Sequence, residues 1–180
     1  EMRSRLFLRT SEFLWQEGHT AHETSKEAIQ ETLTIMRDVY ADVIKNVLRI
    51  PGFIGRKSES ERFPGAVETV TYESMMRDKK ALQSCTSHYL GQLFAKTYGV
   101  QFQTRDGGLD HAYATSWGIS TRIIGGTIMA HGDDQGLRLP SGVAPKQVVI
   151  VPIYRNADEQ SAVIEKAHSI ASDLISVGVR

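Results

Sequence analysis

The feature that most constrains the fold is a series of short strand-like segments joined by tight turns. Asp78-Lys79-Lys80 and Arg105-Asp106-Gly107-Gly108 have turn composition, and each lies between two segments with strand character. The expected strands of these two pairs are 68–76, 81–84, 100–104 and 111–120. Successive hairpins, with helices set apart from them, favour an α+β fold in which an antiparallel sheet carries helices on one face.

A long amphipathic helix is expected before these hairpins. Thr24 or Ser25 is suited to cap its start, and Pro51-Gly52 ends it. Between them, apolar residues from Ile29 to Leu48 recur at spacings of three and four, which is the helical period. The remaining expected elements are strands at 5–9 and 12–16 joined by Thr10-Ser11, a loop at 56–64, and helices at 90–98 and 121–129.

A domain boundary is predicted near Pro145. Pro140, Gly142 and Pro145 lie close together and have the composition of a linker. After them come a continuous apolar strand at 147–152 and an amphipathic helix at 158–176, which is how an α/β domain with a buried parallel sheet begins. We therefore expect one domain at 1–145 and the beginning of a second at 146–180.

Composition excludes several classes of protein. The 21 basic residues balance the 21 acidic ones, so the chain is not a general nucleic-acid coating protein, although it can still bind one RNA through a local patch. The single cysteine, Cys85, excludes an internal disulfide and a cysteine-based metal cluster. No apolar run is long enough to cross a membrane, and no signal-peptide pattern opens the chain, so a cytoplasmic protein with no membrane partner is expected.

The common nucleotide-binding and hydrolase motifs are missing from the sequence. It has no glycine-rich phosphate loop, no dinucleotide-binding glycine motif and no nucleophile elbow. A nucleotide site in this chain would therefore have to use side chains on a sheet.

Three segments concentrate residues suited to binding. In the first, a strand would place Phe13, Trp15, Glu17 and His19 on one face, a combination that suits a small ligand with an apolar body and a positive charge. The alternative is that the aromatic residues belong to the core and that Glu17 and His19 lie at a solvated strand end.

The other two segments have the same ambiguity. Residues 83–88 place hydroxyl side chains between Gln83 and His88 at an expected strand-to-helix junction, which suits either anion binding or an ordinary helix cap. Residues 116–122 lead from a strand into a helix at Arg122, which can stack on a purine or pair with phosphate. The alternative is a surface arginine with Trp117 in the core.

Two further patterns resemble metal sites only weakly. His19 and His22 are three residues apart but have no cysteine nearby, and 131–134 (HGDD) has the composition of a polar turn at a helix end. We expect neither to bind a metal.

Taken together, the segments resemble prolyl-tRNA synthetases. Residues 7–19 (FLRTSEFLWQEGH) resemble the second signature motif of that family, and 83–92 (QSCTSHYLGQ) resemble the segment that precedes the third motif. Residues 116–122 (SWGISTR) followed by 131–137 (HGDDQGL) resemble the third motif itself. The short distance between the second and third motifs resembles the archaeal and eukaryotic-like subtype, which has no editing domain at this place.

The resemblance implies a fold, an activity and a set of site residues. It implies a class II synthetase-type antiparallel sheet flanked by helices, followed by the start of an α/β anticodon-binding domain, and a ligase that uses ATP and Mg²⁺ to join L-proline to tRNA(Pro). Arg9 and Arg122 would be catalytic through their contacts with the phosphates and the adenine. The implied ATP-binding residues are Glu1, Arg9, Thr10, Phe13, Gln83, Thr86, Ser120 and Arg122, with Gln83 near the metal, and the implied proline-binding residues are Trp15, Glu17, His19, His88, Trp117 and Gly118.

The sequence also departs from the family pattern. The first motif, which builds the dimer interface of these homodimers, is absent, and so is the Thr-x-Glu loop that binds the proline amine. The chain opens at Glu1 without a methionine, so we expect a fragment of a longer enzyme that is inactive by itself. A catalytically silent paralogue with a binding or regulatory role remains an alternative.

Overall fold

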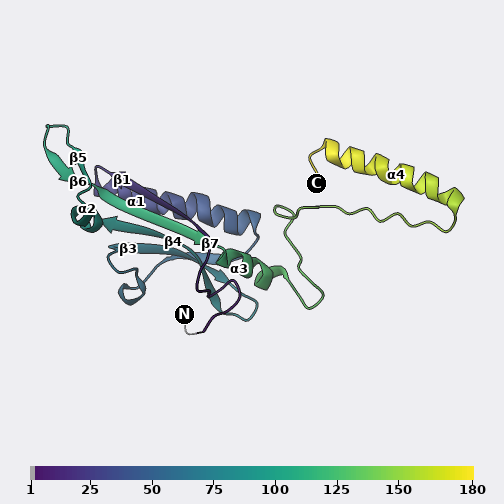
Figure 1. Cartoon of the computed structure of the whole chain (residues 1–180), viewed down its shortest axis with the longest axis horizontal. Coiled ribbons are helices and arrows are strands. Elements are labelled where there is room, and N and C mark those ends of the chain that lie inside the picture. The colour runs from purple at the N-terminus through teal and green to yellow at the C-terminus, as the bar shows by residue number, and fades with distance from the viewer. Residues whose placement is uncertain (1–2) are drawn as a thin grey trace. The chain divides into compact units, whose positions relative to one another are not determined.

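The computed structural model describes residues 3–180 and divides into two units, Glu1–Leu139 and Pro140–Arg180. The first unit is built on an antiparallel sheet of five strands in the order β1-β7-β4-β3-β2 (Figure 1). Its strands are β1 (Trp15–His22), β2 (Gly52–Arg56), β3 (Glu68–Met75), β4 (Ala81–Gly91) and β7 (Tyr113–Ser120). A separate two-stranded hairpin consists of β5 (Gln101–Gln103) and β6 (Leu109–His111).

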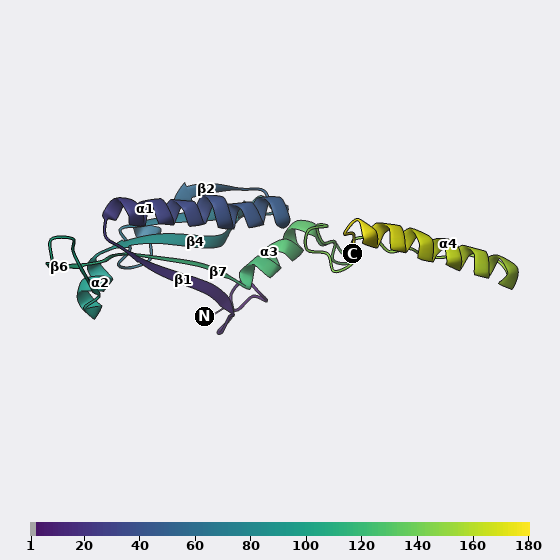
Figure 2. The same cartoon turned by 90° about the horizontal axis from the view of Figure 1, so that it is seen from above.

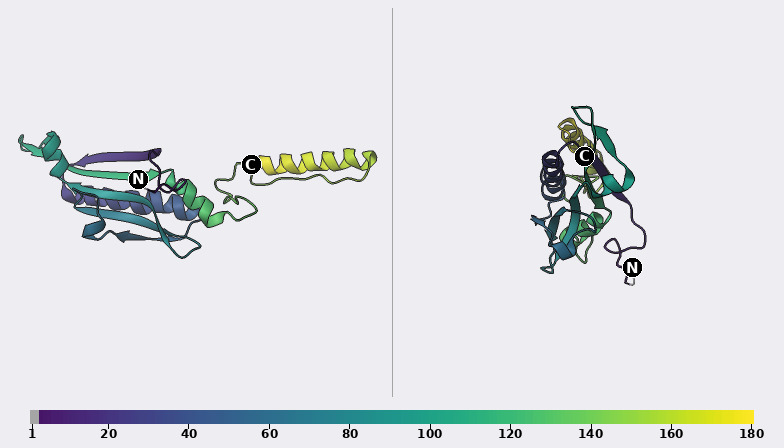
Figure 3. Two further views of the ribbon diagram at one scale, coloured as in Figure 1. Left: turned by 60° about the horizontal axis from the view of Figure 1, so that its bottom comes forward. Right: turned by 90° about the vertical axis from the view of Figure 1, so that its left-hand side faces the viewer.

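One helical run covers a single face of the five-stranded sheet (Figure 2). It begins with α1 (Ser25–Thr34), where Thr24 and Glu27 form the reciprocal hydrogen bonds of a capping box, and it continues through the π-helical η1 (Ile35–Tyr40) and η2 (Val43–Val47). Seen from the end in Figure 3, the run and the sheet form two layers. The other helical elements of this unit are η3 (Glu59–Glu61), α2 (Leu93–Tyr98) and α3 (Arg122–His131).

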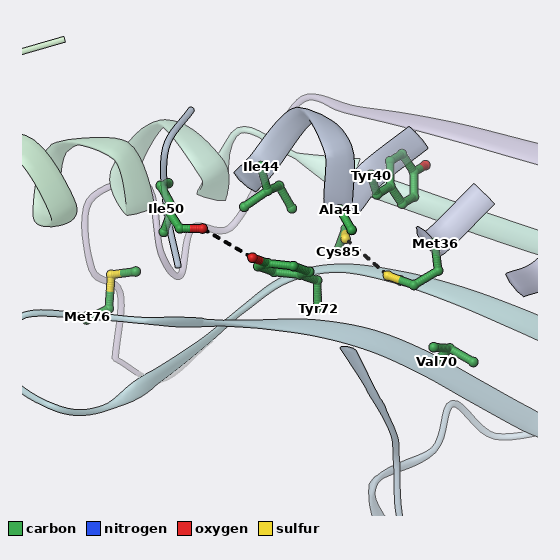
Figure 4. Packing of buried hydrophobic residues seen from close by; sticks show 9 residues of the cluster. All are labelled: Met36, Tyr40, Ala41, Ile44, Ile50, Val70, Tyr72, Met76 and Cys85. Atoms are coloured by element: carbon green, nitrogen blue, oxygen red, sulfur yellow. Dashed lines mark hydrogen bonds between the residues drawn. The ribbon is translucent and has the colours of Figure 1, made fainter. Parts of the chain in front are cut away.

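The hydrophobic core lies between these two layers (Figure 4). Met36 and Ile44 of the helical run are fully buried against Tyr72 of β3 and Cys85 of β4. The Tyr72 hydroxyl donates a hydrogen bond of 3.2 Å to the carbonyl oxygen of Ile50, which ties the segment after the helix to the sheet. Burial raises the pKa of the Cys85 thiol to about 12, so this cysteine is a packing residue and not a nucleophile.

The register of the sheet separates its side chains into two classes. Cross-strand partners share a face, and neighbours along a strand alternate between faces. Trp117 and Ile119 of β7 pack against the core, so they lie on the helix-covered face, and Gly118 and Ser120 belong to the opposite, open face. The core therefore fixes which residues remain available on the open face.

Several predicted elements are confirmed, and others differ from the prediction. The long helix, the hairpin of β3 and β4, and the helices at α2 and α3 agree with the sequence pattern within a few residues. The strand predicted at 5–9 is wrong, because this segment forms a turn closed by a bridge between Arg5 and Arg9. The strand predicted at 12–16 begins only at Trp15 and continues to His22.

The largest difference concerns β4. Residues 83–88 were expected at a strand-to-helix junction, but β4 continues to Gly91 because it pairs with β3 on one side and β7 on the other. The helix start expected at Leu90 moves to Leu93. Strand β2 was not predicted, because polar and apolar residues do not alternate regularly in Gly52–Arg56. This segment is a strand because it pairs with β3.

The second unit contains one helix, α4 (Ala157–Ser176), which the sequence predicted to within a residue. Asn156 caps it by accepting a hydrogen bond of 2.9 Å from the backbone of Glu159. The strand predicted at 147–152 is wrong, since this segment is extended but lacks the neighbouring strand that a ladder requires within the described chain. The assignment of 146–180 to an anticodon-binding domain stays a prediction. No helix among residues 3–180 is long and apolar enough to span a membrane.

The packing of β1 on β7 yields a testable prediction. A Cβ atom at Gly18 would lie 2.7 Å from Cζ2 of the Trp117 indole, whereas one at Gly55 would meet nothing within 4 Å. We predict that Gly18→Ala lowers the free energy of unfolding by about 1–3 kcal/mol through overpacking, and that Gly55→Ala changes it by less than about 0.5 kcal/mol. Urea denaturation measures both, and equal effects of the two substitutions would contradict the packing described here.

Candidate functional site

The open face of the five-stranded sheet collects most of the residues that the sequence singled out. Trp15 and Glu17 of β1 pair with Ser120 and Gly118 of β7, and Gly118 pairs in turn with Thr86 of β4. Because partners share a face, the register extends this face across three strands. The predicted residues on it are Trp15, Glu17, His19, Gln83, Thr86, His88, Gly118 and Ser120.

One cavity of about 230 Å³ lies where this face meets the segment before β1 and the start of α3. Every predicted ATP-binding residue within residues 3–180 lines it. These residues are Arg9, Thr10, Phe13, Gln83, Thr86, Ser120 and Arg122. Glu1, the remaining predicted ATP-binding residue, lies outside the described residues.

Arg122 joins two sides of this cavity. Its Nε donates to the carbonyl oxygen of Leu8 at 3.1 Å, and a terminal nitrogen donates to the carbonyl oxygen of Gln83 at 3.5 Å. The arginine therefore ties the turn that carries Arg9 to strand β4. A guanidinium has five N–H donors, so others remain for a ligand.

Two aromatic rings are exposed at the same cavity. Phe13 and Trp15 are 56% and 52% exposed, and their ring centroids lie 6.0 Å apart in an edge-to-face arrangement. The alternative that both belong to the core is wrong. Exposed aromatic faces that line a concave site provide contact area for a planar or apolar ligand.

A second cavity, of about 470 Å³, lies along the open face near the other end of β1. Glu17 and His19 are among its polar residues, and their side chains form an ion pair at 3.1 Å if the imidazole is protonated. The rest of the lining is mostly apolar and includes Phe63 and Phe94, whose rings stack 6.2 Å apart. A carboxylate beside an apolar wall suits a small cation with a hydrocarbon ring.

His88 lies under the same wall. Its ring is 5.5 Å from that of Phe63, and its Nδ1 forms a hydrogen bond of 2.8 Å with the Thr69 hydroxyl. Burial, together with the smaller effect of the positive charge of Lys57, lowers the pKa of His88 to about 4. At neutral pH this imidazole is uncharged and can orient a ligand by hydrogen bonding without repelling a cation.

The structure separates two residues that the sequence grouped together. Trp117 was expected beside Gly118 among the proline-binding residues, but its indole packs on the helix-covered face, against the core and across Gly18. Only Gly118 faces the cavity. The alternative of Trp117 as a core residue is the correct one for its side chain.

Sequence reasoning missed three residues on or beside the open face. Phe63 and Lys57 lay in a segment expected to be a charged loop, and Glu73 was treated only as part of a strand pattern. Glu73 is the cross-strand partner of Gln83. The only sequence signal for Phe63 and Lys57 is that an aromatic residue and a lysine occur within a polar loop.

The weak metal pattern at 131–134 makes structural contacts. Nε2 of His131 lies 2.7 Å from the carbonyl oxygen of Leu48, and Asp133 closes a turn with Gly136 and pairs with Arg138 at 3.0 Å. Within residues 3–180 no three His, Cys, Asp or Glu side chains come together as a metal-binding group. The expectation of a polar turn at 131–134 is confirmed.

Comparison with known proteins finds relatives that match nearly the whole chain. No family model matches the chain. A proline--tRNA ligase from Protochlamydia amoebophila is 57% identical over 174 residues, and one from Prosthecochloris aestuarii is 58% identical over 179 residues. These alignments cover 97% and 99% of this chain, but only 34% and 37% of the relatives.

A solved structure agrees in fold as well as sequence. The prolyl-tRNA synthetase of Cryptosporidium parvum, crystallised with L-proline and AMP, superposes with a TM-score of 0.86 at 44% identity. The match covers 98% of this chain and 36% of that protein. The chain thus spans about a third of the length of the relatives it matches.

These findings establish the fold class of the chain. The antiparallel sheet with flanking helices is the class II synthetase-type arrangement that the sequence predicted. Within that class, the chain is homologous over nearly its whole length to a part of the prolyl-tRNA synthetases.

The environment of His88 predicts a dependence of stability on pH. Its folded-state pKa of about 4 lies below its ordinary value of 6.5, so the unfolded chain binds the proton more tightly between these values. The contribution to stability is complete above pH 6.5 and is lost as the pH falls toward 4. We predict a loss of about 1–2 kcal/mol from this group, after allowance for its partial exposure.

Urea unfolding of wild type and His88→Gln at pH 7 and pH 4.5 measures this contribution. The variant should lose less stability on acidification than wild type, while His168→Gln, at an exposed position of α4, should behave as wild type does. Identical pH dependence in His88→Gln and wild type would show that His88 is not buried as described.

Proposed function

We propose that the whole protein containing this chain is a proline--tRNA ligase, which activates L-proline with ATP and transfers it to the 3′ end of tRNA(Pro). The observation that carries the proposal is the gathering of seven predicted nucleotide-binding residues around one cavity, beside a second cavity with a carboxylate. The homologues of this chain are proline--tRNA ligases, and the matched solved structure was crystallised with L-proline and AMP.

The nucleotide is assigned to the first cavity. We assign the adenine to the space between Phe13 and Arg122, since an aromatic ring and a planar guanidinium can stack on its two faces. Arg9, which is exposed at the cavity, is assigned to the phosphates. Thr10, Gln83, Thr86 and Ser120 complete the proposed contacts.

Proline is assigned to the neighbouring part of the open face. The carboxylate of Glu17 suits the proline ammonium group, and the Trp15 ring and the wall that includes Phe63 suit its hydrocarbon ring. His19 and neutral His88 are assigned to the polar rim of this pocket, and the backbone at Gly118 to its floor. With these assignments, the amino acid would lie beside the nucleotide on one sheet face.

The reaction needs no protein nucleophile. A proline carboxylate oxygen forms a bond to the α-phosphorus of ATP, the bond from that phosphorus to the bridging oxygen breaks, and pyrophosphate leaves with the electron pair. Charge builds on the phosphoryl oxygens, so Arg9 and Arg122 would act by electrostatic stabilisation and positioning. The terminal ribose hydroxyl of tRNA then attacks the adenylate carbonyl and releases AMP.

The residues present fit a magnesium ion that is held mainly by nucleotide phosphates. Gln83 has an amide oxygen and Glu73, its cross-strand partner, has a carboxylate, and Mg²⁺ in such sites takes one or two protein oxygens and completes its shell with phosphate and water. When bound, the ion would neutralise phosphate charge. We assign Gln83, with Glu73, to it.

The remaining partners follow from the same proposal. The whole enzyme is expected to be a cytoplasmic homodimer, and residues 146–180 to begin the domain that binds the anticodon. Although 147–152 forms no strand within the described residues, Val149, Val151 and Ile153 are 75%, 72% and 83% exposed, and pairing of this segment into a sheet of the whole enzyme would cover them.

Proline-dependent exchange of pyrophosphate into ATP tests the proposal in the full-length protein. We predict exchange by wild type, and a loss of about 10²–10³-fold in Arg122→Ala, because this removes both a ligand contact and the tie between Leu8 and Gln83. Arg138→Ala is the matched control, since Arg138 lies beyond the same helix and its one salt bridge within residues 3–180 is with Asp133. No exchange by a folded wild-type protein would contradict the proposal and favour the silent paralogue.

A further inference from the structure

Lys57 has an environment that its predicted loop position does not explain. It directly follows β2, and its backbone N–H donates to the carbonyl oxygen of Thr69 at 2.9 Å. Thr69 is the cross-strand partner of His88 and faces the open side. The backbone of Lys57 therefore lies level with Thr69 and His88, beside the proposed proline pocket. From there its ammonium group reaches Gln83 and donates a hydrogen bond to the side-chain amide oxygen.

This position lies between the two proposed ligands. Gln83 lines the nucleotide cavity, and His88 lies under the wall of the proline pocket. The charge of Lys57 contributes to the lowered pKa of His88, which is consistent with an ammonium group close to both Gln83 and His88. The reacting atoms of the proposed step, the proline carboxylate and the α-phosphate, would meet between these same residues.

Lys57 also lacks the partner that a partly buried lysine usually has. No ion pair within residues 3–180 includes it, whereas its neighbour Arg56 pairs with Glu68 at 2.7 Å. Glu73, the cross-strand partner of Gln83, accepts a hydrogen bond from the Thr71 hydroxyl. A part-buried cation whose only described side-chain partner is a neutral amide is electrostatically suited to an incoming anion.

We propose, on the basis of the proposed function, that Lys57 is a further catalytic residue whose ammonium group contacts the oxyanions where the proline carboxylate meets the α-phosphate. It donates hydrogen bonds and keeps its protons throughout, so it changes no bond. Its positive charge favours the step because it stabilises the negative charge that builds between the two reactants. Gln83 holds the flexible lysine side chain in place before the ligands bind.

The test compares charged ligands with uncharged analogues in the full-length protein. Lys57→Met removes the charge and keeps most of the length, Lys57→Arg keeps the charge, and Arg56→Met is the neighbouring control. Pyrophosphate exchange gives kcat and KM, and calorimetry gives the affinities for L-proline, L-prolinol, AMP and adenosine. Prolinol lacks the carboxylate and adenosine lacks the phosphate.

We expect Lys57→Met to lower kcat for exchange about 10²–10³-fold, and Lys57→Arg to recover at least a tenth of wild-type activity. We also expect Lys57→Met to weaken binding about tenfold or more for the charged member of at least one ligand pair, and little for its uncharged analogue. A selective loss for proline assigns the contact to the carboxylate, and a selective loss for AMP assigns it to the phosphate.

Two results would overturn the role of Lys57. One is exchange by Lys57→Met within about threefold of the Arg56→Met control. The other is equal weakening of charged and uncharged ligands, because that pattern indicates a structural role through Gln83. A folded wild-type protein that neither exchanges pyrophosphate nor binds proline or AMP contradicts the proposed function itself, and the catalytic role of Lys57 falls with it.

Discussion

The packing of one helical run on one face of the sheet determines what the other face can do. Met36 and Ile44 bury that face against Tyr72 and Cys85, so the alternate residues of each strand must point to the other side. Many of these alternate residues are polar or aromatic, and Trp15, Glu17 and Thr86 among them stay at least partly exposed. The open face thereby becomes a platform on which residues from β1, β4 and β7 meet, although the paired residues Trp15 and Ser120 are 105 positions apart in sequence.

The electrostatics of this platform are consistent with the proposed chemistry. Arg9 and Arg122 lie at the nucleotide cavity, Lys57 reaches Gln83 at its edge, and Glu17 lies in the next cavity along the face. Positive groups are thus arranged where phosphate and carboxylate charge would develop, and a negative group lies where an amine would bind. His88 remains neutral at physiological pH, so it adds no charge that would disturb this arrangement.

Sequence reasoning predicted those parts of the fold that depend on local pattern. The helix after Thr24 has a cap and a helical period, and the hairpin at Asp78-Lys79-Lys80 has turn chemistry, so both are predictable. Strand β2 and the extension of β4 to Gly91 depend on pairing with distant strands, which a local pattern does not encode. The proposed site residues come from the family resemblance, but the face on which Trp117 lies, and the proposed role of Lys57, required the register of the sheet.

The two tryptophans allow the most direct test of the central claim, that the open face binds both ligands. Trp15 lies on the open face and Trp117 on the helix-covered face, so their indole N–H resonances report on the two faces of one sheet. The measurement is the change in each resonance as L-proline and AMP are added to the full-length protein, with assignment through Trp15→Phe. A large shift for Trp15 and a small one for Trp117 is the predicted result. A shift confined to Trp117, or no shift of either resonance at saturating ligand, would contradict the account.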